Sequence, residues 1–247
     1  MTESPRWPKT VPELSAEERR IHADFMRRWH EILPARYGLI ERFNHGFPVR
    51  HSRRGFVTTL EIGAGLGEHL EHERLTPEQE RGYYAVEVLE LMAERLRERH
   101  PGVHAIVGDC QQRLDFPDGF FDRYIAVHVL EHLPNLPAAV AEAWRLLDKS
   151  AGQLLVVIPC EGGAAYSLAR RISAQRVFEK AYGIPYEPFI RREHLNVPAE
   201  ILAVLRTHFA IELRRFFPFA PLPFVGANLC IGLVLAPLAQ PLPAANA

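Results

Sequence analysis

The residues whose chemistry is easiest to interpret are one acid and three glycines that follow a short apolar run. Glu61, Gly63, Gly65 and Gly67 lie in the segment TTLEIGAGLGEHL, residues 58–70. Alternating glycines after a strand let the backbone turn tightly and approach a ligand closely. A glutamate stands where the nicotinamide dinucleotide fingerprint has its third glycine, so the loop predicts a ligand other than a pyrophosphate.

Three further segments carry polar residues directly after apolar runs. Glu87 closes the run YYAVE, and Asp109 and Cys110 follow the next run in GDCQ. The third segment, FDRYIAVHVLEHLPN, spans residues 121–135. A carboxylate at a strand end can accept two hydrogen bonds from ribose hydroxyls. Taken singly, each acid is equally explained as a solvated or strand-terminating residue.

In this order and spacing, the four segments resemble class I methyltransferases that use S-adenosylmethionine, and within them the type-11 group. The resemblance covers about residues 58–159. It implies that the glycine loop approaches the methionine and ribose of the cofactor, that Glu87 binds the ribose hydroxyls and that Asp109 contacts the adenine. The cofactor-binding residues that it implies are Glu61, Gly63, Ala64, Gly65, Gly67, Glu87, Val88, Asp109, Cys110, Val127 and His128.

Methyl transfer depends mainly on alignment, and a histidine near neutral pH suits any general base that it needs. The candidates are His128, His132 and His194. His128 and His132 flank Glu131 and could share a helical face, which also resembles a metal-ligand pair. No third ligand stands out in the sequence, so we predict no metal site. In the family that the chain resembles, a pair such as Glu131 and His132 commonly organises the loop. His194 either faces the methyl group or caps the next helix together with Asn196.

From Phe56 onward, apolar runs alternate with helical patterns. The predicted strands are 57–62, 82–87, 103–108, 121–127, 153–158, 209–217 and 228–236, and the predicted helices are 66–73, 89–100, 136–148 and 198–207. Strands separated by helices form parallel units with the ligand at their carboxyl ends. We therefore expect an α/β fold: a Rossmann-like, doubly wound, seven-stranded sheet, mostly parallel, whose last strand is antiparallel by resemblance.

The segments outside this alternation predict a helical lid. Residues 1–55 are expected to form an N-terminal tail and a lid helix, because Ser15 and Glu18 have capping-box spacing. The apolar residues of that helix recur on one face: Ile21, Phe25, Trp29, Ile32 and Leu33. Residues 56–247 are expected to form the methyltransferase domain. Its insertion at about 160–208 is too long for a simple connection and should shape the acceptor pocket.

Composition limits the function classes. The 247 residues carry a net charge of −1, which argues against a nucleic-acid acceptor. Three cysteines, Cys110, Cys160 and Cys230, are too few and too scattered for a disulfide framework or a zinc site. The first residues lack an apolar signal core, and the longest apolar stretch, near 227–237, is too short to span a membrane, so a cytoplasmic protein is expected.

We therefore predict an S-adenosylmethionine-dependent methyltransferase acting on a small-molecule acceptor at oxygen, nitrogen or carbon, such as a natural-product, sugar or lipid-type intermediate. The segment RRFFPFAPLPF, residues 214–224, is either core or an apolar wall that could contact a lipidic acceptor or a membrane surface. A non-catalytic cofactor-binding protein and a nucleic-acid or protein methyltransferase stay open as alternatives. The sequence does not indicate an oligomeric state.

Overall fold

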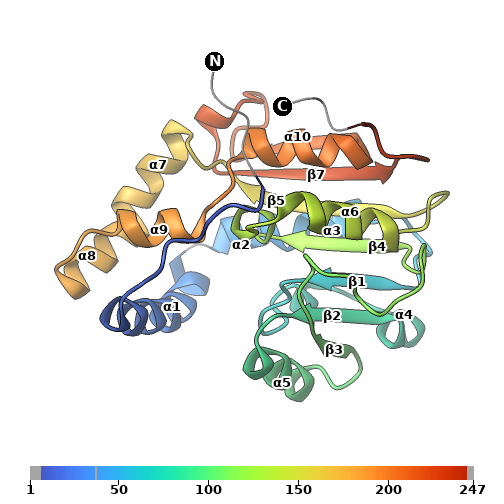
Figure 1. The fold of residues 1–247 in the computed structure, drawn as a ribbon, viewed down its shortest axis with the longest axis horizontal. Helices are drawn as coiled ribbons and strands as arrows, with labels where there is room; N and C mark the ends of the chain where they lie inside the picture. The colour runs from blue at the N-terminus through green and yellow to red at the C-terminus, as the bar shows by residue number, and fades with distance from the viewer. Residues whose placement is uncertain (1–6, 37, 244–247) are drawn as a thin grey trace.

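A seven-stranded sheet forms the centre of the computed structural model, which describes residues 7–36 and 38–243 (Figure 1). Its strands are β1 (Thr59–Ile62), β2 (Tyr83–Glu87), β3 (His104–Val107), β4 (Arg123–Val127), β5 (Gln153–Pro159), β6 (Phe209–Phe217) and β7 (Cys230–Pro237). Their order is β3-β2-β1-β4-β5-β7-β6, and β7 runs antiparallel to both of its neighbours. The predicted Rossmann-like sheet, mostly parallel with an antiparallel last strand, is confirmed.

The helices follow the predicted alternation with one exception. They are α1 (Ala16–Arg36), α2 (Gly38–Asn44), α3 (Gly46–His51), α4 (Pro77–Arg81), α5 (Glu90–Arg99), α6 (Leu136–Leu146), α7 (Ala164–Arg170), α8 (Arg176–Tyr182), α9 (Glu187–Glu193) and α10 (Pro198–His208). A π-helical turn, η3 (Arg171–Gln175), joins α7 to α8, and short 3-10 turns occur at η1 (Leu70–His72), η2 (Leu130–His132) and η4 (Val225–Ala227).

The predicted helix at 66–73 is wrong. Gly65 and Gly67 both have positive φ angles, and the Leu66 N–H donates to the Glu68 carboxylate at 2.9 Å instead of entering a helix. Only the turn η1 forms there. The helix in this part of the chain is α4, where Thr76 and Gln79 form a capping box.

The sheet is packed on both faces because alternate residues of each strand point in opposite directions. On β1, Leu60 and Ile62 join the main core beneath α6 and α10. On the opposite face, Leu155 and Val157 of β5 pack against Phe47 of α3. This burial of both faces is what a mostly parallel sheet requires, and it leaves the strand ends free to hold a site.

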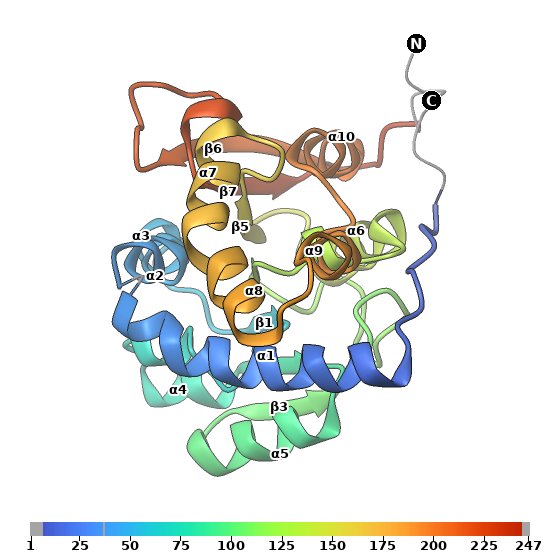
Figure 2. The same cartoon turned by 90° about the vertical axis from the view of Figure 1, so that its left-hand side faces the viewer.

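A layer of helices covers the carboxyl ends of the parallel strands, and we call α1, α7, η3, α8 and α9 the helical cover (Figures 1 and 2). Ser15 and Glu18 form the expected capping box at the start of α1, with hydrogen bonds of 2.8 and 3.2 Å. Phe25 of α1 packs edge-on against Phe178 of α8 at 5.0 Å between ring centroids. The cover thus has an apolar core of its own, which joins the N-terminal helix to the insertion.

The side chains of Trp29, Ile32 and Leu33, which were expected to share this face of α1, lie outside the described residues. Polar contacts supplement the apolar core. His22 of α1 pairs with Glu193 of α9 at 2.9 Å, and the Tyr182 hydroxyl donates to Asp24 at 2.6 Å.

The aromatic segment after β6 divides into two parts. Phe216 is buried in the main core, and Phe217 stacks on Phe43 of α2 at 4.9 Å, so these two are structural. Phe219 and Phe224 are about half exposed on the loop to β7. Within the described ranges, none of the helices combines the length and apolar character that a membrane crossing requires.

We expect Phe178→Ala to destabilise the protein by about 3–5 kcal/mol, because a fully buried ring at the centre of the cover leaves a cavity when it is truncated. Urea denaturation followed by circular dichroism measures the change. Phe219→Ala is the matched control and should stay within about 0.5 kcal/mol of the unmodified protein, since that ring is 55% exposed. Equal losses in the two variants would contradict this description of the cover.

Candidate functional site

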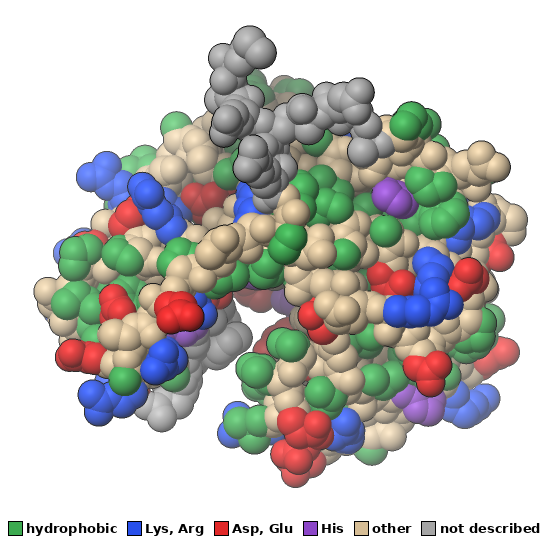
Figure 3. Space-filling view, viewed as in Figure 1, with side chains coloured by type: hydrophobic (Ala, Val, Ile, Leu, Met, Phe, Trp, Pro, Cys, Tyr) green, Lys and Arg blue, Asp and Glu red, His purple; other side chains and the backbone are tan. Residues whose placement is uncertain are grey.

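A cavity of about 420 Å³ lies between the strand ends and the helical cover. The space-filling view shows a hollow between the lobe that holds the cover and the lobe that holds β1, β2 and β3 (Figure 3). The sheet side of the cavity is lined by predicted residues: Glu61, Gly63, Ala64, Gly65, Val127 and His128. The cover side contributes Phe25, Tyr166, Arg170, Ile190 and His194.

The glycine loop after β1 has a shape that side chains would prevent. Gly63 has φ 61°, and a Cβ there would lie 2.5 Å from Val129 Cγ2. Gly65 has φ 59°, and a Cβ there would lie 2.6 Å from a Glu68 carboxylate oxygen. Positive φ and close approach both favour glycine, so this loop brings bare backbone to the cavity wall.

The predicted acid of β2 lies next to this loop. The Gly65 N–H donates to Glu87 Oε1, and the Val88 N–H donates to Glu87 Oε2. Burial raises the pKa of Glu87 above its usual value, although these two backbone donors oppose the shift. Glu87 is 8% exposed and closes β2 beside the loop.

Several predicted cofactor residues do not line the cavity: Gly67, Glu87, Val88, Asp109 and Cys110. Glu87 ends β2 and Val88 follows it, and Asp109 and Cys110 lie just beyond β3, so these four extend along the strand ends away from the cavity. Asp109 Oδ1 accepts hydrogen bonds from the backbone and side chain of Gln111 at 2.9 and 3.0 Å. The structure therefore brings together one half of the predicted set and places the other half beside it.

Glu61 is almost fully buried in the cavity wall, where its carboxyl accepts a hydrogen bond of 2.7 Å from the Tyr83 hydroxyl. Burial raises its pKa to about 8, against the lowering effect of that hydrogen bond. At neutral pH the group is therefore mainly the uncharged acid. A buried acid that can ionise gives the cavity a means of balancing a cationic ligand.

Three predicted histidines, two from the segment after β4 and one from the insertion, converge around Glu131. His128 has a left-handed backbone, φ 53°, which is uncommon for a residue with a side chain and frequent at functional sites. Its Nδ1 lies 3.0 Å from Glu131 Oε1. Burial opposes the charge of His128, but its contacts with Cys230 and Glu131 raise its pKa well above the usual range.

Glu131 is the negative centre of this cluster. Its burial favours the uncharged acid, but the hydrogen bond from His128 and the charges of the neighbouring histidines lower its pKa to about 2. His132 Nδ1 lies 2.6 Å from the Glu193 carbonyl oxygen, and His194 Nδ1 lies 2.7 Å from Glu161 Oε2. Each ring is thus oriented by an oxygen at its Nδ1, and His132 turns its Nε2 toward Glu131 Oε1 at 3.8 Å.

A buried amide fixes this arrangement. Asn196 donates from Nδ2 to the carbonyl oxygens of Leu130 and Leu133, both at 2.8 Å, and its backbone N–H donates to the Glu131 carbonyl at 3.0 Å. The side chain does not cap α10, whose N-cap is Val197. Asn196 instead ties the segment carrying His194 to the turn η2.

The structure adds site residues that the sequence did not single out. Glu161 is the second residue after β5, and it pairs with both His194 and Arg170, the latter at 2.6 Å. Its position just after a strand was a usable signal, whereas the thiol of the preceding Cys160 is fully buried. No sequence pattern indicated Glu193, because its contact with His132 depends on the packing of α9 against η2.

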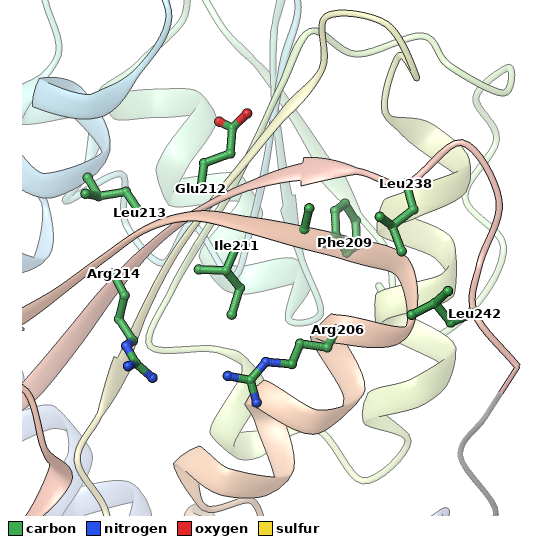
Figure 4. Close-up of a pocket in the computed structure, with 9 residues that line it drawn as sticks. Arg206, Phe209, Ile211, Glu212, Leu213, Arg214, Leu238 and Leu242 are labelled. Carbon is green, nitrogen blue, oxygen red and sulfur yellow. The ribbon is translucent and has the colours of Figure 1, made fainter.

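A second depression, of about 640 Å³, follows the edge strand β6 (Figure 4). Ile211, Arg206 and Leu242 are among its lining residues. None of the predicted site residues lines it, so the cavity under the cover is the candidate functional site.

Residues 60–156 match the family model described as a methyltransferase domain, of the type-11 group. This part of the chain, residues 60–156, is a methyltransferase domain. The match covers β1 to β5 and therefore includes the glycine loop, Glu87, Asp109 and the His128 segment. S-adenosylmethionine is the cofactor of this domain, as the sequence predicted.

Solved methyltransferase structures resemble the whole fold. A methyltransferase from Thermotoga maritima is 20% identical, with a TM-score of 0.59 and coverage of 88% of this chain and 98% of that one. A TehB-like S-adenosylmethionine-dependent methyltransferase from Corynebacterium glutamicum is 16% identical, with a TM-score of 0.56 and coverage of 89% and 100%.

The N-methyltransferase NodS from Bradyrhizobium japonicum, solved with S-adenosylhomocysteine, is 15% identical, with a TM-score of 0.51 and coverage of 92% and 89%. These identities establish the fold of the methyltransferase domain and no acceptor. The search of curated proteins found no match.

Glu61, the buried acid in the cavity wall, makes the free energy of unfolding depend on pH. Between about pH 4.5 and pH 8 the folded state holds a proton on Glu61 that the unfolded state has released, so stability should fall as pH rises through this window. The slope is at most about 1.4 kcal/mol per pH unit for one proton. Urea denaturation at several pH values should show this fall, and Glu61→Gln should reduce it most clearly between about pH 5 and pH 6.5, below the range in which the raised pKa of His128 also contributes. Parallel profiles for the two proteins would contradict the assignment.

Proposed function

We propose that this protein transfers the methyl group of S-adenosylmethionine to a small-molecule acceptor held under the helical cover. The observation that carries the proposal is the cavity itself. One wall is the glycine loop of a methyltransferase domain, and the opposite wall is a separate set of polar and apolar groups from the cover. Cofactor and acceptor could thus meet in one enclosed space, and alignment of that kind supplies much of the rate of a group transfer.

The division of the chain follows from the same geometry. We propose that residues 1–55 form the tail and lid helix, and that residues 56–247 form the methyltransferase domain with its acceptor-site insertion at about 160–208. The apolar contacts of Phe25 with the insertion support this division, because they make the N-terminal helix part of the same cover. The lid is therefore assembled from two distant segments of the chain.

The residues present fit the cofactor. Gly63 and Gly65 line the cavity, and a Cβ at either would collide with Val129 or Glu68, so this loop offers bare backbone to the methionine part. We assign the ribose hydroxyls to Glu87 with Val88 beside it, the adenine to Asp109 and the Cys110 backbone, and the methionine part to Glu61, Ala64, Gly67, Val127 and His128. When bound, the cofactor supplies an activated methyl on a sulfonium.

A small molecule is favoured over a nucleic acid or a protein as acceptor. A cavity of about 420 Å³ lies in the size range of small-ligand pockets. The net charge of −1 supplies no general attraction for nucleic acid. The acceptor wall combines Phe25, Ile190 and Tyr166 with the ion pair of Arg170 and Glu161, which suits a partly apolar molecule that carries polar groups.

The three histidines differ in their suitability as a general base. His128 is held as a cation by Glu131, so it is a poor proton acceptor at neutral pH and is better suited to organising the turn. His132 and His194 each donate from Nδ1 to an oxygen, which leaves a lone pair on Nε2. We propose that these two face the acceptor, and that in the absence of a bound ion the Nε2 of either ring takes its proton.

Calorimetric titration with S-adenosylmethionine and with S-adenosylhomocysteine tests the cofactor assignment. Glu87→Gln should weaken binding by about 10- to 100-fold, because hydrogen bonds to a charged acceptor contribute about 1.5–3 kcal/mol. Glu90→Gln is the matched control: it removes an exposed carboxylate three residues away on α5 and should leave the affinity unchanged. Equal losses in both variants, or no binding to folded protein, would contradict the assignment.

Turnover separates the enzyme from a non-catalytic cofactor-binding protein. The protein incubated with labelled S-adenosylmethionine and a panel of hydroxylated, amine and carbon-acid small molecules should transfer label to at least one of them. Binding of the cofactor with no transfer to small molecules, and transfer to RNA or protein instead, would overturn the choice of acceptor class.

A further inference from the structure

The cluster at the acceptor wall has the composition of a metal site. One potential ligand atom from each of Glu131, His132 and His194 lies within 4.8 Å of those of the other two. His132 Nε2 is 3.8 Å from Glu131 Oε1. Two ligands about 2.1 Å from one tetrahedral ion are roughly 3.4 Å apart, so only small side-chain shifts would bring them into coordination distance.

The hydrogen bonds determine which ring nitrogen is available. A carbonyl oxygen can only accept, so the contact with Glu193 places the proton of His132 on Nδ1. The Glu161 carboxylate does the same for His194. Both rings therefore offer an Nε2 lone pair. A ligating histidine that donates its other N–H to a carbonyl or carboxylate is the usual outer-shell arrangement of metal sites.

Glu131 supplies the third ligand and the negative charge. Its side chain is 1% exposed, and Oε1 is occupied by His128. Oε2 is buried and, in the described part of the chain, has no hydrogen-bond partner. A buried carboxylate oxygen without a partner is costly, and an ion bound there would satisfy it.

The scaffold holds the three groups in place before any ion arrives. Asn196 links the backbone next to His194 to both ends of η2, the turn that contains Glu131 and His132. All three groups also line the cavity. Preorganised ligands with an open side toward a pocket distinguish a catalytic metal site from a closed structural one.

We propose that Glu131, His132 and His194 bind a divalent transition-metal ion, with Glu161 and Glu193 orienting the two histidines. Two imidazoles and one carboxylate suit Zn²⁺ and its first-row neighbours and leave at least one coordination position for the cavity. An acceptor oxygen in that position would be more acidic, since a bound metal lowers the pKa of its oxygen ligand. This last consequence rests on the proposed function, whereas the metal site itself does not.

Binding of Co²⁺ by tag-free, chelator-treated protein tests the proposal without cofactor or acceptor. The visible absorption of Co²⁺ reports its coordination, and Zn²⁺ should displace it at one ion per chain. His194→Ala and His132→Ala should each weaken binding by more than about 100-fold. Glu161→Gln should weaken it by about 10- to 100-fold, the usual effect of losing an outer-shell partner.

His104→Gln is the matched control, because that ring lies at the start of β3 and contacts the Arg81 carbonyl, far along the strand from the cavity. It should bind Co²⁺ as the unmodified protein does. Circular dichroism confirms that each variant is folded. Absence of one-to-one binding by the unmodified protein, or equal affinity in His194→Ala, overturns the metal site. Cofactor titration of the same samples shows separately whether the methyltransferase assignment survives.

Discussion

The site depends on a single buried charge, the Glu131 carboxylate. A charge taken out of water costs several kcal/mol unless other groups compensate for it. Here His128 binds one oxygen, His132 and His194 face the group, and the turn that carries it is held by Asn196. His128 combines a left-handed backbone with a ring that pairs with Glu131. Removing the carboxylate would take away the negative charge that the three histidines face.

The sheet supplies the place for this charge, and the cover closes it. Parallel strands end at one edge, so the glycine loop after β1, Glu87 after β2 and the turn after β4 meet there. The cover then adds what the sheet lacks, namely His194, Glu193 and an apolar wall centred on Phe25. Because the cover joins α1 to α8, this side of the cavity depends on contacts between segments more than 150 residues apart.

Local patterns were sufficient to predict the strands and most helices. The run at 153–158, for example, was predicted as a strand, and every residue of β5 is buried. The helix expected at 66–73 failed because apolar spacing ignores the positive φ angles of Gly65 and Gly67, which favour a loop. The cofactor motifs were recognisable because they follow strands directly. The proximity of His194 to Glu131 could not be recognised from the sequence, since 63 positions separate them. Only the packing of α9 and Asn196 brings them together.

The most direct measurement is a crystal structure of the complex with S-adenosylhomocysteine. If the account is right, the homocysteine sulfur lies in the cavity between the Gly63–Gly65 loop and His128, with the ribose at Glu87 and the adenine at Asp109. The open side of the sulfur then faces His132 and His194. A ligand bound elsewhere, or one whose sulfur points away from the histidines, would contradict the claim that this cavity joins cofactor and acceptor.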